Sequence, residues 1–167
     1  MLVIQKHRTT PVYQSLTDNY LEDCIHQIDL MRYFAGEVEP LETHCQIKEG
    51  KLQSAVSTAM LPQGGLGTIL STHTAGIWQE SATIYAENCT IHVDAFRNLW
   101  IRQADHEELF GTDRPGKWVA DLQERGFIPE IEHFFHCIKT REEPESNAFE
   151  AAKTQQLMEK FVSSIQK

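Results

Sequence analysis

Four side chains that could transfer protons recur at helical spacing between residues 22 and 33. They are Glu22, His26, Asp29 and Tyr33, at positions i, i+4, i+7 and i+11. On a helix these positions share one face, because residues three and four apart are neighbours. Histidine titrates nearest neutrality, and a carboxylate one turn away fixes its tautomer. The pattern predicts a proton-transfer site; the plainer alternative is a His and an Asp that bond neighbouring backbone at a helix surface.

The same stretch predicts the helix that must carry this face. A second set of residues falls within about a third of the helical circumference and forms an apolar stripe. Asp18 is the expected N-cap residue, and Gly36 is the expected end of the helix. We therefore predict one amphipathic helix over residues 21–36, with its apolar stripe formed by Leu21, Cys24, Ile25, Ile28, Met31 and Ala35.

Composition limits the classes of protein that the chain can belong to. Its 167 residues suit a single domain, residues 1–167. A net charge of -9 argues against binding to nucleic acid, whose phosphates need a basic surface. The chain has no apolar run of about 18 residues, so a membrane span is not expected. Four widely spaced cysteines predict reduced core thiols and a cytoplasmic protein: Cys24, Cys45, Cys89 and Cys137.

The rest of the chain predicts strands followed by helices. Residues 1–7 read as a strand that begins abruptly, so we expect either a fragment whose upstream part is missing or a domain with an N-terminal edge strand. A polar loop is expected over residues 105–118, and helices over 130–139 and 148–165, the latter with a capping box of Asn147 and Glu150. The order indicates an α+β fold with mainly antiparallel pairing. Strands are expected over residues 41–47, 51–59, 66–73, 82–86, 90–94 and 96–102.

Other motifs do not indicate a nucleotide, metal or acyl-transfer site. The run Gly64-Gly65-Leu66-Gly67 lacks the third glycine and the following helix of a dinucleotide-binding turn, so it reads as a loop. His133 and His136 lack the flanking ligands of a metal site, and no metal is expected. No Gly-x-Ser-x-Gly elbow exists, and no cysteine has a histidine partner that the sequence identifies.

Four stretches resemble, in order, the C-terminal domain of the glucose-fructose oxidoreductase and inositol dehydrogenase family (Gfo/Idh/MocA). Residues 21–30, with the ending at Gly36, resemble the helix that opens that domain. Residues 81–94 are similar to a strand-turn-strand, residues 126–138 to a late helix, and residues 148–165 to the terminal helix. The resemblance spans nearly the whole chain, and the order is more specific than any single stretch.

The resemblance implies a fold and a chemistry. The fold would be an open, predominantly antiparallel sheet with helices packed on one face, and the exposed sheet face would form a homo-oligomer. Family members oxidise or reduce a sugar, polyol or related compound with NAD or NADP, which a separate N-terminal domain binds. That domain and the Glu-Lys-Pro motif with its catalytic lysine are absent from this sequence. We therefore expect no cofactor to bind this chain alone, and no catalysis by it alone.

The resemblance also assigns site residues. The family's catalytic histidine falls on His26, and its preceding acidic residue falls on Glu22, where an aspartate is usual. The implied mechanism has His26, alone or with the missing lysine, remove a hydroxyl proton while Glu22 orients it. The recurrent aspartate falls on Asp29. The predicted substrate-binding residues are Asp29 and three weaker neighbours, Arg8, Trp78 and His73.

Three hypotheses follow. The first is the substrate-binding and oligomerisation domain of an NAD(P)-dependent oxidoreductase that acts on a small polar substrate such as a sugar or polyol. The second is a non-enzymatic module of the same fold, kept for dimerisation or for binding a small ligand. The third is an unrelated α+β protein in which the His26 face has only a structural role.

Overall fold

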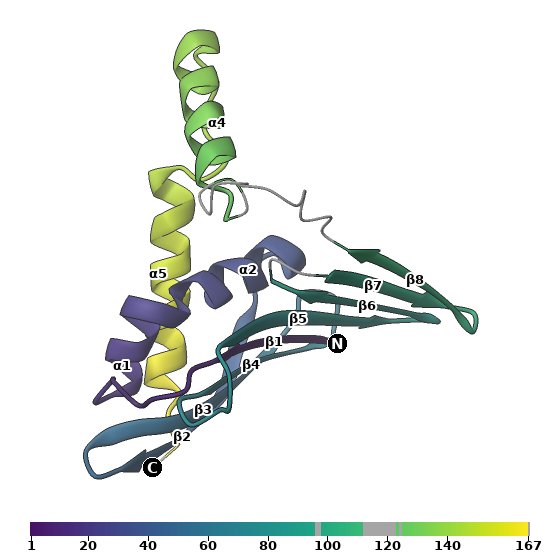
Figure 1. Ribbon diagram of the computed structural model, residues 1–167. Coiled ribbons are helices and arrows are strands. Elements are labelled where there is room, and N and C mark those ends of the chain that lie inside the picture. Colours follow the sequence, from purple (N-terminus) through teal and green to yellow (C-terminus); the bar gives the residue numbers. More distant parts are fainter. Residues whose placement is uncertain (96–97, 112–122, 124, 167) are drawn as a thin grey trace.

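The computed structural model describes residues 1–95, 98–111, 123 and 125–166 (Figure 1). One eight-stranded sheet has the order β2-β3-β4-β1-β5-β6-β7-β8. Among the described strands, the pair β1 and β4 is parallel and the other neighbours are antiparallel, so the predicted α+β class is confirmed. The strands are β1 (Leu2–His7), β2 (Glu39–Lys48), β3 (Lys51–Met60), β4 (Leu66–Thr72), β5 (Gln79–Ala86), β6 (Cys89–Asp94), β7 (Asn98–Gln103) and β8 (His106–Gly111).

β8 corrects the sequence prediction of a polar loop. It lies within residues 105–118, which were expected to be irregular, and it pairs with β7 along its whole length. Its charged first half obscured the strand pattern, because strand signals rely on apolar alternation. The rest of that predicted loop, residues 112–118, lies outside the described residues.

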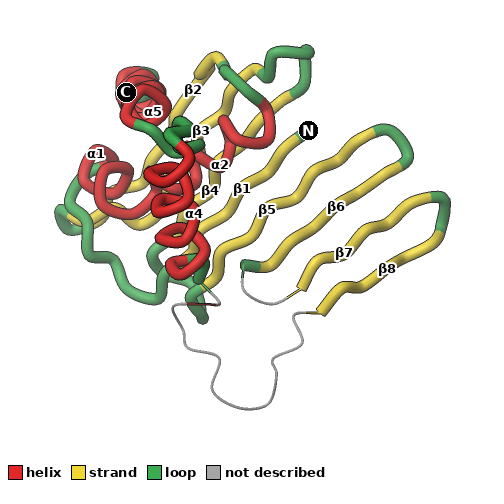
Figure 2. The backbone as a smooth tube through the Cα atoms, turned by 90° about the horizontal axis from the view of Figure 1, so that it is seen from above, coloured by secondary structure: helices red, strands yellow, loops and turns green. Residues whose placement is uncertain are grey.

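The helices stand on one face of the sheet. They are α1 (Leu16–Asn19), the π-helix η1 (Tyr20–Cys24), α2 (Ile25–Ala35), α4 (Phe127–Thr140) and α5 (Ala148–Ser163). Figure 2 shows them above β1 to β4, while β6 to β8 extend beyond them. Ile4, Ile28, Ile69 and Phe161 are among the buried side chains that join this helical layer to the sheet. None of the described helices is long and apolar enough to cross a membrane.

The predicted helix over residues 21–36 is longer and less regular than expected. It begins after Ser15, whose Oγ accepts a hydrogen bond from the Asp18 N–H, so Ser15 is the N-cap in place of Asp18. Gly36 ends it as predicted, with φ of 79° and its N–H donating to the Arg32 carbonyl. A π turn accommodates one extra residue, which shifts the helical phase.

The phase shift changes which residues are buried. Within the π turn Tyr20, Asp23 and Cys24 are buried, and the buried series continues in α2 with Gln27 and Ile28. Leu21, placed in the apolar stripe by a constant helical period, is 48% exposed. The buried face also carries charged and polar groups that an apolar stripe does not predict.

The two C-terminal helices were predicted correctly, but their apolar faces differ. Asn147 caps α5 by accepting hydrogen bonds from the N–H groups of Phe149 and Glu150. In α5, Met158 and Phe161 are buried. In α4 the amphipathic pattern is present, yet its large apolar side chains are each about half exposed: Ile131, Phe134, Phe135 and Ile138.

Candidate functional site

A groove of about 700 Å³ opens between α2 and the start of α5. His26, Asp29 and Tyr33 line it from α2, so the structure brings three of the four predicted residues together. Glu22 is exposed one turn earlier and is not part of the lining. The opposite wall comes from residues that the sequence analysis did not single out: Glu145, Ser146, Glu150, Ala151 and Thr154.

His26 is an unpaired titratable group in the lining of this groove. Its imidazole is exposed, and it forms no hydrogen bond or ion pair with the described part of the chain. No bond of this kind joins it to Glu22, although four residues separate them. An imidazole without a partner can accept or donate a proton to a bound ligand.

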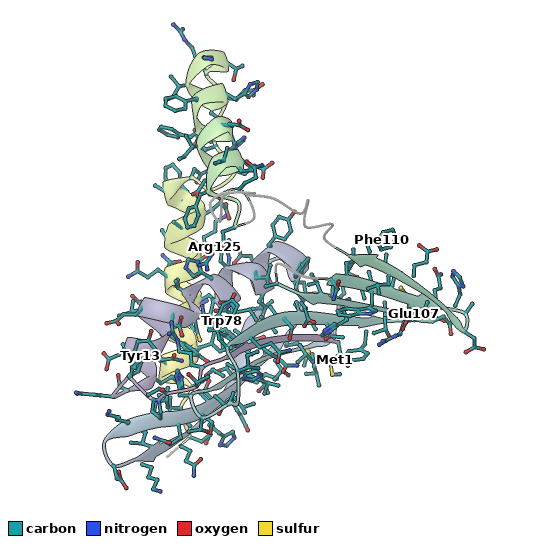
Figure 3. The ribbon with its side chains drawn as sticks, viewed as in Figure 1. Met1, Tyr13, Trp78, Glu107, Phe110 and Arg125 are labelled. Carbon is teal, nitrogen blue, oxygen red and sulfur yellow. The ribbon has the colours of Figure 1, made fainter. Side chains whose placement is uncertain are left out.

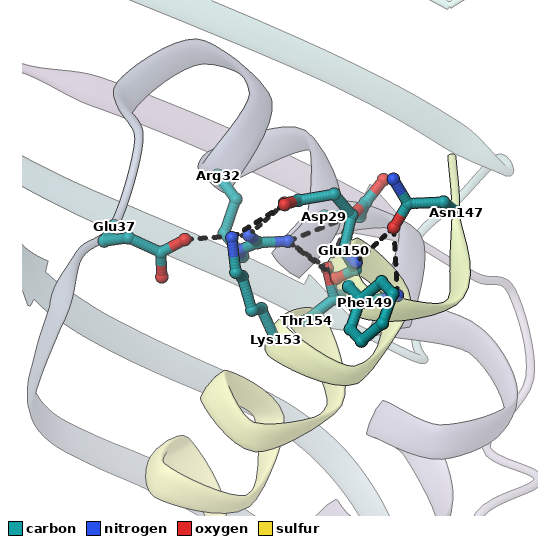
Figure 4. Close-up of polar contacts among 8 residues, drawn as sticks. All are labelled: Asp29, Arg32, Glu37, Asn147, Phe149, Glu150, Lys153 and Thr154. Carbon is teal, nitrogen blue, oxygen red and sulfur yellow. Dashed lines mark hydrogen bonds and ion pairs between the residues drawn. The ribbon is translucent and has the colours of Figure 1, made fainter. Parts of the chain in front are cut away.

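Asp29 is tied to the groove wall rather than to His26. The Thr154 hydroxyl donates to Asp29 Oδ1 at 2.6 Å, and Arg32 Nη1 lies 3.9 Å from the same oxygen (Figure 4). Arg32 also donates to Glu150 and Glu37, at 2.7 and 2.8 Å. Asp29 therefore helps to join α2 to α5 as it lines the groove.

The charges of this wall stabilise one another. Burial alone would lower the pKa of Arg32, but its bonds with Glu37 and Glu150 outweigh burial and raise that pKa. The pKa of Glu150 is lowered by hydrogen bonds from Lys153 and Arg32. Both Nη atoms of Arg32 therefore donate hydrogen bonds to protein groups, and the wall is held in place before a ligand binds.

Arg8, predicted to bind substrate, belongs to a charge network on the sheet side of the helix and does not line the His26 groove. Its Nε and Nη2 donate to the two carboxylate oxygens of Asp23, at 2.5 and 2.6 Å. Lys6 Nζ lies 2.9 Å from Asp23 Oδ1 and 2.7 Å from Glu80 Oε1. Gln27 donates to the other Glu80 oxygen. We call Lys6, Arg8, Asp23, Gln27 and Glu80 the buried charge network.

The network keeps its members charged. Burial would raise the pKa of Asp23, but bonds from Arg8 and Lys6 overcome burial and lower it. Burial would likewise lower the pKa of Lys6, and its bonds with Glu80 and Asp23 raise it instead. Sequence reasoning missed this cluster. One signal was present, since the strand alternation Leu2, Ile4, Lys6 places the lysine on the buried face.

His73 and Trp78 do not line the His26 groove. His73 is 1% exposed, packs edge-on against Tyr13 with ring centroids 5.5 Å apart, and has no hydrogen-bond partner for either ring nitrogen among the described groups. Burial lowers the pKa of His73. Trp78 is partly exposed at a separate small pocket of about 130 Å³, next to Glu80. Of the predicted site residues, His26 and Asp29 therefore share the groove, whereas Glu22, Arg8, His73 and Trp78 lie outside its lining.

Two other sequence motifs have clear structural outcomes. Gly64 and Gly65 lie in the turn between β3 and β4, and Leu66 and Gly67 begin β4, so no helix follows the glycines. Cys137 does have a histidine partner, contrary to the sequence reading, because His133 Nε2 lies 3.6 Å from its Sγ one turn earlier on α4. Cys137 is buried.

No three His, Cys, Asp or Glu side chains among the described residues lie close enough together to hold a metal ion.

Solved dehydrogenases share this fold. A dehydrogenase (MviM) from Clostridium difficile matches with a TM-score of 0.85 and 23% identity, over 98% of this chain and 54% of that one. A Gfo/Idh/MocA family oxidoreductase from Vibrio cholerae matches with a TM-score of 0.71 and 16% identity, over 98% and 50% of the two chains. Levoglucosan dehydrogenase, solved in complex with NADH, matches with a TM-score of 0.73 and 14% identity, over 98% and 55%.

These likenesses establish the fold, and the chain spans about half the length of the structures that it matches. Neither a protein-family model nor a curated protein matches the sequence. The fold is therefore one that occurs within dehydrogenases of the Gfo/Idh/MocA type.

Proposed function

We propose that this chain is the substrate-binding and oligomerisation half of an NAD(P)-dependent oxidoreductase that acts on a sugar, a polyol or a related compound. The observation that carries the proposal is the unpaired His26 in an open groove, on a fold found in dehydrogenases. The groove is large enough for a small polar ligand, since ligand sites commonly enclose about 300–1,000 Å³. Its lining also offers hydrogen-bonding groups suited to hydroxyls, including the Tyr33 phenol and the Ser146 hydroxyl.

In this proposal His26 moves the proton. A neutral imidazole nitrogen accepts the proton of a substrate hydroxyl when alcohol is oxidised, and returns it in the reverse direction. Asp29, held by Thr154 and Arg32, keeps the adjacent wall in place so that the ligand meets a preformed surface. Glu22 remains a predicted orienting residue, which would have to turn toward His26 in the liganded state.

The proposal places the dinucleotide site outside this chain. The glycine-rich turn of the described residues leads into β4, whereas phosphate binding needs a helix N-terminus after the glycines. Hydride acceptance by NAD or NADP would therefore require another domain. Consistent with such a requirement, the matched dehydrogenases are about twice as long as this chain.

The oligomerisation part of the proposal concerns the sheet face without helices. Large apolar side chains on that face are between one third and one half exposed, and an exposed apolar area of this kind is typical of an association surface. They come from three adjacent or nearby strands: Val56 and Met60 of β3, Leu66 of β4 and Tyr85 of β5.

Calorimetric titration tests the site. We would titrate the chain with a panel of neutral sugars and polyols, and with NADH and NADPH, and repeat it with His26→Ala. The matched control is His44→Ala, which removes an exposed histidine from β2, far from the groove lining. The proposal expects sugar or polyol binding that is lost in H26A and kept in H44A. Binding that survives H26A would contradict it, and silence across the panel would favour a dimerisation module of the same fold.

A further inference from the structure

The two edge strands of the sheet, β2 and β8, differ in how far their outer backbone groups are protected from pairing with another strand. At the β2 edge, the segment after α5 pairs with the strand: the Thr43 N–H donates to the Ser164 carbonyl at 3.1 Å, and the Gln166 N–H donates to the Thr43 carbonyl at 2.9 Å. Pro40 and two register shifts further interrupt this edge. Covering, proline and bulges are the usual means by which proteins block edge-to-edge association.

Among the residues that the structure describes, none covers the β8 edge, and the strand has neither a proline nor a register shift. All six residues of β8 are exposed, and the register with β7 is unbroken from His106 to Gly111. The backbone edge that faces away from β7 receives no hydrogen bond from a described residue outside this hairpin. Leu109 and Phe110 are 58% and 50% exposed. An open, regular and partly apolar edge is a template for another strand.

We propose that β8 pairs antiparallel with β8 of a second copy of this chain, so that the sheet continues across a two-fold axis. The inference deepens the oligomerisation part of the proposed function and rests on it, but it names a different contact, the edge of the sheet and not its open face. A two-fold axis perpendicular to the sheet keeps the helices of both copies on the same side.

The carboxylates of β8 favour one register of this pairing. Glu107 and Leu109 point to the helix-free face, and Phe110 points to the helix side, as Figure 3 shows for Glu107 and Phe110. With Leu109 opposite its own copy on the axis, Glu108 faces Phe110 and Glu107 faces Gly111. A shift of the axis to Glu108 would place two carboxylates directly opposite each other, which is destabilising. The Leu109 register avoids this contact.

The expected association is weak. Two six-residue edges bury less than the roughly 800 Å² per partner of a standard stable interface. The fraction of dimer should therefore rise with protein concentration, and the dimer should dissociate at high dilution.

Sedimentation velocity over about a hundred-fold range of concentration measures this equilibrium. The wild-type chain should shift from monomer to dimer. Leu109→Lys should remain monomeric, because it sets two ammonium groups against each other on the axis. Val12→Lys, a matched change at an exposed residue of the loop before α1, is the control and should leave the shift intact. Leu66→Lys tests the open sheet face separately.

A disulfide tests the register without depending on the lysine variants. In a background with Cys45→Ser and Cys89→Ser, Leu109→Cys should form a covalent dimer on mild oxidation, because paired Cα atoms about 4.5–5.5 Å apart suit a disulfide. Glu108→Cys, whose partner is displaced by two residues, should form much less.

The outcomes separate the two contacts. If Leu66→Lys abolishes the dimer and Leu109→Lys does not, the open face is the interface and the edge proposal is overturned. If the wild-type chain stays monomeric throughout, both contacts are overturned. A disulfide that forms equally well at Glu108 and Leu109 contradicts the proposed register.

Discussion

The two faces of the helix from Leu16 to Ala35 use similar residue types for different purposes. On the exposed face His26 is unpaired, and Tyr33 and Asp29 line an open groove. On the sheet side Asp23 is buried and bonded to two cations. Charged groups that satisfy one another hold the helix in place, whereas groups left unsatisfied at a groove can act on a ligand. The comparison indicates that partners, more than residue types, distinguish a structural cluster from a candidate site.

The largest expected effect comes from breaking the buried charge network. Asp23→Ala would leave Lys6 and Arg8 facing each other without their shared carboxylate, and removing one partner of a buried ion pair costs about 3–5 kcal/mol. Urea unfolding followed by circular dichroism measures the loss of unfolding free energy. Glu22→Ala, one residue away but exposed, is the control and should change it by less than about 0.5 kcal/mol. Equal losses in the two variants would contradict the division between the faces.

A smaller loss is expected where the two faces meet, at Arg32. Arg32→Met keeps the aliphatic stem but removes hydrogen bonds to Thr154, Glu150 and Glu37. Bonds to charged groups contribute about 1.5–3 kcal/mol, so we expect destabilisation in that range. Lys153→Met removes an exposed ion pair on the same carboxylate and serves as the control, with little change expected. Similar unfolding midpoints for both variants would show that Arg32 does not join α2 to α5.

Part of this comparison was predictable from the sequence. The α+β class, the helix end at Gly36 and the Asn147 cap follow from local signals, because periodicity, turn glycine and capping act over a few residues. The groove position of His26 also agreed with the helical spacing. The partners of Asp23 could not be predicted, because Lys6 lies in β1 and Arg8 directly after it, and both reach Asp23 only when the helix packs on the sheet.

Other failures have equally local causes. A helical wheel assumes a constant period, and the π turn breaks that assumption between Tyr20 and Cys24, which is why Leu21 was misplaced. The pairing of Arg8 with Asp23 could not be predicted, because the two residues are 15 positions apart in the sequence and belong to different elements. His73 was predicted to be a neighbour of the substrate site, but it lies directly after β4 and its side chain is buried, which no local sequence signal indicates.

Acid should weaken the sheet side of the helix in two stages. Burial lowers the pKa of His73 in the folded protein. Below about pH 6.5 the imidazole of the unfolded chain therefore binds a proton, whereas the imidazole of the folded protein stays neutral to a lower pH. Stability from this source is complete above that pH and declines as pH falls toward the folded pKa. The lowered pKa of Asp23 adds a second decline below about pH 4.

Unfolding free energies at a series of pH values measure both stages. His73→Leu should flatten the profile between about pH 6.5 and 5, and leave the decline below about pH 4 unchanged. His44→Leu, at an exposed site, is the control and should keep the wild-type profile. A profile of H73L parallel to wild type would show that the buried imidazole does not resist protonation.

The smallest effect on stability is expected on the groove face. His26→Ala removes a side chain without a described partner, so the unfolding free energy should change by less than about 0.5 kcal/mol. The same variant is expected to lose ligand binding. A large loss of stability would instead indicate a structural role for His26 and support the plainer reading of its helical face.

The most direct test is NMR of the histidine ring protons during titration with the sugar and polyol panel. His26 in the groove and buried His73 beneath the helix report on its two sides within one sample. The account predicts that a bound polyol shifts the His26 resonances in a saturable manner, and leaves those of His73 unchanged. Saturable shifts at His73 with none at His26 would place the ligand on the opposite side of the helix and contradict the proposed site.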